Sequence, residues 1–102
     1  MEHVILANQF YEIKAQFDQN RIGFLQNELE VCFTLVKVVE TERKMGDFEH
    51  AKRALANAEE GHTTLRRFLC DPKHAKHIRE EERRELTGLM EQLRSTLDSL
   101  ER

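Results

Sequence analysis

Hydrophobic residues recur along the middle of the chain at alternating steps of three and four. From residue 22 onward these positions are Ile22, Leu25, Leu29, Cys32, Val36 and Val39. This spacing places them along one side of an α-helix. It predicts a helix from about Asn20, whose side chain can cap the helix start, to Met45. Gly46 then occupies the position where a left-handed residue commonly ends a helix.

A second stretch with helical spacing begins directly after this glycine. Its apolar stripe consists of Phe48, Ala51, Leu55, Ala58, His62, Leu65 and Leu69. Asp47 precedes the stripe and can cap the new helix with its carboxylate. Because the connection is so short, the two helices must fold back on each other as a hairpin. If the numbers of facing residues sum to about 93 in such a hairpin, His62 lies near Cys32.

The remainder of the chain predicts a corner followed by a third long helix. Pro72 ends the second helix, because proline disfavours helix immediately before itself, and residues 71–78 form the corner. The third helix runs from about Arg79 to Leu100, with apolar positions at Leu86, Met90, Leu93, Leu97 and Leu100. Three helices of similar length predict an antiparallel up-down-up bundle. We therefore expect one all-α domain over residues 1–102.

Residues 1–19 allow two arrangements. Leu6, Phe10, Ile13 and Phe17 form a helical stripe. The following segment, DQNRIG, shifts the phase of the pattern before Ile22. The segment is therefore either an additional N-terminal helix or arm, or the first part of one long bent helix.

The helix expected at 20–45 carries a second apolar row, about two residues out of phase with the first. This row is Phe24, Val31, Leu35 and Val38. Four large apolar side chains form a patch at the upper end of what a monomer leaves exposed. Either residues 1–19 cover the row as a fourth helix, or another chain does. We predict that these four residues bind a partner, in a homodimer or with another protein.

The composition narrows the class of protein. With 34% charged residues, one proline and four glycines, the 102 residues favour long helices over sheets. The net charge of -3 gives no global attraction to nucleic acid or to an anionic membrane. No apolar stretch approaches the roughly 18 residues of a membrane span, and the first residues lack the positive charge of a secretory signal. We expect a cytoplasmic protein that binds neither nucleic acid nor membranes.

The hairpin residues resemble a known family. Gly46, Asp47 and Phe48, followed by Ala51, Leu55 and Ala58, resemble the turn and second helix of a tetratricopeptide repeat. The likeness covers about a dozen residues and departs from the family at Val39 and Glu42. With a third helix added, the chain is similar to the three-helix microtubule-interacting-and-trafficking domains. This resemblance implies a fold and does not specify a partner.

The corner also gathers side chains with metal-binding or anion-binding chemistry. Cys70, Asp71, His74 and His77 offer ligands for zinc, but structural sites usually join two distant pairs, so we predict no metal and no cofactor. The basic residues around them are Arg66, Arg67, Lys73, Lys76, Arg79, Arg83 and Arg84, which can bind a phosphate or an acidic peptide or simply form a solvated surface. A metal- or ligand-sensing bundle that uses residues 70–77, or a core pocket at His62, is the alternative function.

No catalytic constellation is visible. A nucleophilic pair of Cys32 and His62 would need an exposed thiolate, an orienting group and an oxyanion hole, so we expect His62 to be a hydrogen-bonded core residue. The sequence also lacks a glycine-rich phosphate loop and paired catalytic carboxylates. It therefore predicts a non-catalytic protein-protein interaction module rather than an enzyme.

Overall fold

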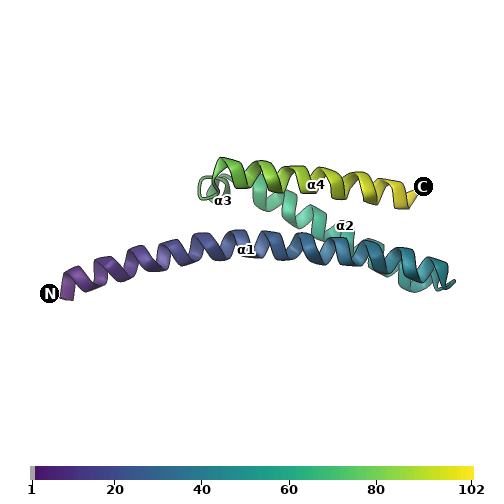
Figure 1. Cartoon of the computed structure of the whole chain (residues 1–102), viewed down its shortest axis with the longest axis horizontal. Helices are drawn as coiled ribbons and strands as arrows, with labels where there is room; N and C mark the ends of the chain where they lie inside the picture. The colour runs from purple at the N-terminus through teal and green to yellow at the C-terminus, as the bar shows by residue number, and fades with distance from the viewer. Residues whose placement is uncertain (1) are drawn as a thin grey trace.

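The chain folds into four α-helices, shown in Figure 1. In the computed structural model they are α1 (Glu2–Lys44), α2 (Phe48–Cys70), α3 (Pro72–Ala75) and α4 (Glu80–Glu101). The structure describes the backbone of residues 2–102 and the side chains of residues 20–102. The three long helices pack against one another, and no strand occurs within the described backbone. The expectation of an all-α fold is confirmed.

The N-terminal segment is not a separate helix. α1 continues without a break through residues 17–22, so the second of the two sequence-based alternatives, one long helix, is the arrangement found. Asparagine and glycine lower helix propensity by only about 1 kcal/mol or less each, and without a proline they leave the backbone hydrogen bonds intact. α1 curves gently and extends well beyond α2 and α4, which makes the molecule 66 Å long and 22 Å wide.

This continuity excludes one possible cover for the second apolar row. A segment that continues α1 along its own axis cannot fold back over residues 24–38 of the same helix. Of the two covers considered for the row, a fourth helix made by residues 1–19 is therefore wrong for residues 2–19, which continue α1. The side chains of Leu6, Phe10, Ile13 and Phe17 lie outside the described residues.

The turn between α1 and α2 has the predicted form. Gly46 adopts a left-handed φ of 80°, and its N–H donates to the Arg43 carbonyl at 3.1 Å. The Asp47 N–H donates to the Glu42 carbonyl at 2.8 Å. This pair of bonds is the Schellman motif, which satisfies carbonyls at the end of α1 that have no partner within the helix. Asp47 caps α2, as expected, by accepting from the His50 N–H at 3.2 Å.

The core forms where the first apolar stripe of α1 meets α2 and α4. Cys32 fixes the pairing of α1 with α2, since its sulfur donates to the Ala58 carbonyl at 3.8 Å and lies directly against Gly61. A Cβ atom on Gly61 would stand 2.5 Å from that sulfur. Cys32 therefore faces Gly61, as the predicted sum of about 93 requires. The buried residues that surround this contact include Leu25, Leu29, Val36, Leu65, Leu69, Leu86, Met90, Leu93 and Leu97.

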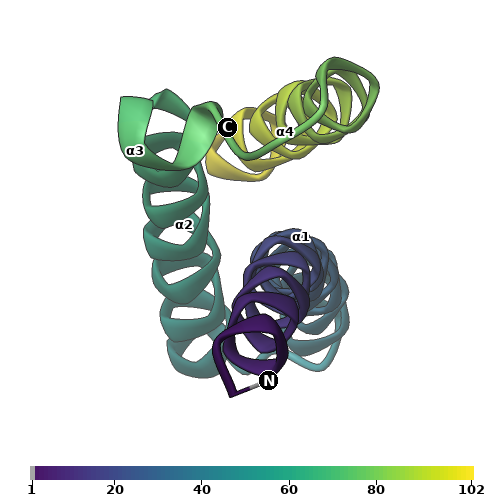
Figure 2. The ribbon, with the colours of Figure 1, turned by 90° about the vertical axis from the view of Figure 1, so that its left-hand side faces the viewer.

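α4 joins the hairpin through the corner and through one interhelical ion pair. Asp71 ends α2, and its side chain caps the short α3 by accepting from the Lys73 N–H at 2.9 Å. Arg94 of α4 donates two hydrogen bonds to Glu59 of α2, at 2.8 and 2.6 Å. Figure 2 looks along α1 and shows α2 and α4 lying on adjoining sides of it. Among the described residues, no other helix lies against the remaining sides of α1.

Candidate interaction surface

Three of the four residues predicted to bind a partner form an exposed row on α1. Phe24, Val31 and Val38 are 44%, 49% and 37% exposed, and we call them the α1 row. Because they are seven residues apart, they lie on one face of the helix. Leu35, the fourth predicted residue, is half-buried. It packs against the buried residues around Cys32 and against a second buried group, which consists of Val39, Ala51 and Ala54. It therefore lies between the core and the α1 row rather than at the centre of a free surface.

An aromatic cluster supports the N-terminal end of the α1 row. The ring of Phe24 lies 5.7 Å from the ring of Phe68 on α2, at an angle of 43°. Phe68 in turn stacks on His74 of α3, with ring centroids 3.8 Å apart. The sequence analysis did not find this cluster. The one signal for it is that Phe68 stands next to, rather than within, the apolar stripe of α2.

The side chains of the corner do not converge as metal ligands. Asp71 caps α3, and His74 stacks on Phe68 with its Nδ1 buried and without a hydrogen bond inside the described part of the chain. Cys70 is an exposed free thiol. Asp71 and His74 are used for capping and packing. The metal- or ligand-sensing function suggested for residues 70–77 therefore has no assembled site among these side chains.

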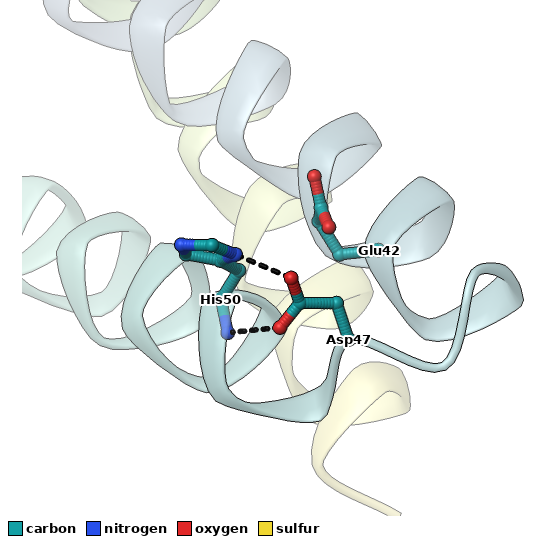
Figure 3. Close-up of side chains that lie close together, drawn as sticks. All are labelled: Glu42, Asp47 and His50. Carbon is teal, nitrogen blue, oxygen red and sulfur yellow. Dashed lines mark hydrogen bonds and ion pairs between the residues drawn. The ribbon is translucent and has the colours of Figure 1, made fainter.

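A different group of ligand-type side chains meets at the turn between α1 and α2. The donor atoms of Glu42, Asp47 and His50 all lie within 4.8 Å of one another, and Figure 3 shows their arrangement. One carboxylate oxygen of Asp47 accepts from the His50 N–H, and the other bonds to His50 Nδ1 at 2.5 Å. These bonds from His50 hold the pKa of Asp47 below its usual range.

This trio could hold a divalent cation, because two carboxylates and an imidazole are common metal ligands. Both oxygens of Asp47, however, already bond to His50, so the visible role of the group is to cap α2. From the sequence alone, Asp47 was predicted only as a cap. A Glu and a His flanking the glycine turn were the signal it missed.

His62 is a core residue, as predicted. It is buried and lies close to the backbone of Met90 on α4. Burial is the main cause that lowers the pKa of His62, and the positive charge of Arg94 adds to it. Burial also raises the pKa of Cys32, so its thiol stays protonated. A protonated, enclosed thiol is a poor nucleophile.

Comparison of the chain with protein-family models, with curated proteins and with solved structures returned no match. The resemblance to tetratricopeptide and microtubule-interacting-and-trafficking domains therefore stays a prediction. Within the part of the chain that the structure describes, no helix combines the length and the apolar character needed to cross a membrane.

Proposed function

We propose that the protein is a non-catalytic protein-protein interaction module, an antiparallel up-down-up bundle that self-associates through the α1 row. The observation that carries this proposal is the row itself. Phe24, Val31 and Val38 are large, apolar and at least one-third exposed, and they share one face of α1. Because α1 is continuous over Glu2–Lys44, residues 2–23 cannot fold back to cover the row.

The spacing of the row favours a second copy of this chain as the partner. Positions 10 and 17 are also phenylalanine, so an apolar residue recurs at every seventh position from 10 to 38. A step of seven is close to two turns of an α-helix, so an apolar residue at each step keeps one face of the helix apolar. Two α1 helices related by a two-fold axis would bury the same row on each other. Full burial of a large apolar side chain contributes about 1.5 to 3 kcal/mol, and partial burial contributes less.

The oligomeric state of a charge-substituted variant tests the proposal. We expect the wild-type chain to sediment as a dimer at high micromolar concentration. Val31→Lys/Val38→Lys should be a monomer that keeps its helical circular dichroism, because both side chains lie outside the core. Leu35→Lys is the weaker choice, since Leu35 also packs against the core.

The chain offers a matched control. Gln26 and Glu40 are also exposed on α1, and they lie on the side of the helix opposite the α1 row. Gln26→Lys/Glu40→Gln changes the net charge by the same amount as the two lysines in the row, and this variant should remain dimeric. A monomeric wild-type protein, or a dimer that survives the lysines at 31 and 38, would contradict self-association through the α1 row.

A further inference from the structure

A cleft of about 410 Å³ lies between α2 and α4, on residues that take no part in the α1 row. Its volume is within the range of small-molecule sites, roughly 300 to 1,000 Å³. Its floor consists of three buried residues, His62, Leu69 and Met90. Leu69 and Met90 give the floor aliphatic surface, and the buried ring of His62 lies beside them.

The rim of the cleft is positively charged although the chain as a whole carries a net charge of -3. Three arginines, Arg66, Arg83 and Arg94, line it, and the rim has one carboxylate, Glu91. Arg94 is committed to Glu59 and Asp98. Arg66 and Arg83 are exposed and have no ion pair within the described residues.

The electrostatic effect of these arginines already reaches the floor of the cleft. Besides burial, the positive charges of Arg94 and Arg66 lower the pKa of His62. An anion placed at the rim would therefore enter a region of positive potential. It would meet two guanidinium groups whose planar forks match a carboxylate.

A second hollow, of about 580 Å³, shares Arg83 and Glu91 with the cleft. Its remaining charged residues, Glu80 and Arg84, pair with each other at 3.5 Å. Ile78 is its only large apolar lining residue. This hollow thus lacks both the aliphatic floor and the surplus of unpaired cations.

We propose that the cleft between α2 and α4 binds a single-chain anionic amphiphile, a carboxylate with an alkyl tail of medium length. The tail lies over Leu69 and Met90, and the flexible methionine side chain adapts to its shape. The carboxylate accepts hydrogen bonds from Arg66 and Arg83. This recognition is independent of self-association through the α1 row, because the lining residues belong to α2 and α4 alone.

The full chain can be tested with octanoate, kept below its micelle concentration, by a ¹H–¹⁵N chemical-shift titration. We expect the largest shifts at residues 62–70 and 83–94. Octan-1-ol, which has the tail without the charge, should bind at least about tenfold more weakly, and acetate, which has the charge without the tail, should produce no saturable shift. A tenfold difference is what the loss of one charge-assisted hydrogen bond gives.

Two exposed arginines provide a matched pair of variants. Arg66→Gln should weaken octanoate binding about tenfold and leave octan-1-ol binding unchanged. Arg84→Gln removes the same charge from the neighbouring hollow and should leave both affinities at the wild-type value. Circular dichroism confirms that each variant is folded.

Four results would overturn the proposal. Octanoate and octan-1-ol could bind equally well, which would mean that the head group is not recognised. Octanoate could bind Arg66→Gln as tightly as wild type. The shifts could instead concentrate at residues 24–38, which would place the amphiphile on the α1 row, or no saturable binding could occur at all.

Discussion

Two faces of α1 carry similar residues and have opposite surroundings. On one face Leu25 and Leu29 are 0% and 2% exposed, whereas on the other Phe24 and Val31 are 44% and 49% exposed. Both faces are apolar at helical spacing, so hydrophobicity alone does not separate them. The difference arises because α2 and α4 occupy only adjoining sides of α1. A helix with two neighbours needs one apolar face for its own fold, and the second face is therefore available for a partner.

Truncation of one residue on each face gives the largest expected contrast. Leu29→Ala removes a buried side chain and should lower the free energy of unfolding by about 2 to 5 kcal/mol. Val31→Ala on the exposed face should change it by about 0.5 kcal/mol or less in the monomer. Urea denaturation at two protein concentrations separates folding from association. Leu29→Met, which keeps the volume, should cost less than about 1.5 kcal/mol; equal losses for Leu29→Ala and Val31→Ala would erase the distinction between the faces.

Glycine substitutions sharpen the comparison by probing how closely α2 approaches the buried face. Gly61→Ala places its Cβ 2.5 Å from the Cys32 sulfur and should destabilise the protein by about 1 to 3 kcal/mol. Gly88→Ala is the control, because nothing lies within 4 Å of its Cβ, and it should stabilise α4 by about 0.5 to 1 kcal/mol. In a Cys32→Ala background the cost of Gly61→Ala should shrink, which a double-mutant cycle measures. An unchanged cost would mean that the sulfur is not the obstacle.

The turn at Gly46 sets how α2 packs against the buried face of α1. Substitutions in this turn should change the free energy of unfolding less than the substitutions above. Gly46→Val should lose about 1 kcal/mol or more, because a β-branched residue is strained at a φ of 80°. The open space around Gly46 means that backbone conformation alone causes the loss. Gly46→Asn tolerates this conformation better and should lose less. Thermal melts of the two variants suffice, and identical melting temperatures would contradict the role of the left-handed residue.

The smallest expected effect is a dependence of stability on pH that comes from His62 of α2. Its pKa is lowered in the folded state, so protonation favours the unfolded chain. The contribution of neutral His62 to stability is fully present above the unfolded pKa of about 6.5 and is lost as the pH falls below it. Urea midpoints between pH 7.5 and 5.5 should therefore decline in the wild type and decline less in His62→Gln. Parallel slopes for the two proteins would assign the pH dependence to other groups.

The sequence determined the local features of this protein. The steps of three and four place apolar residues on defined sides of helices whatever the later packing, so both rows of α1 and the stripes of α2 and α4 were predictable. The Schellman turn at Gly46 and the cap at Asp47 involve residues only a few positions apart, so they too follow from the sequence. The pairing of Cys32 with Gly61 follows in turn from the short turn. The helix start predicted at about Asn20 was wrong, because α1 already begins at Glu2. Weak helix formers such as asparagine and glycine shift the apolar pattern of the sequence without ending the helix.

Only the tertiary structure decided what lies across from each helix face. Leu35 belongs to the second row by spacing, but α2 and α4 approach closely enough to draw it half into the core. The ion pair of Arg94 with Glu59 and the stack of Phe68 on His74 join residues from different elements. The cleft with Leu69 and Met90 at its floor is formed by residues of both α2 and α4, so it depends on how these two helices pack. Helical periodicity specifies the direction of a side chain around its own axis, whereas contacts between helices depend on crossing angle and axial offset, which no local pattern encodes.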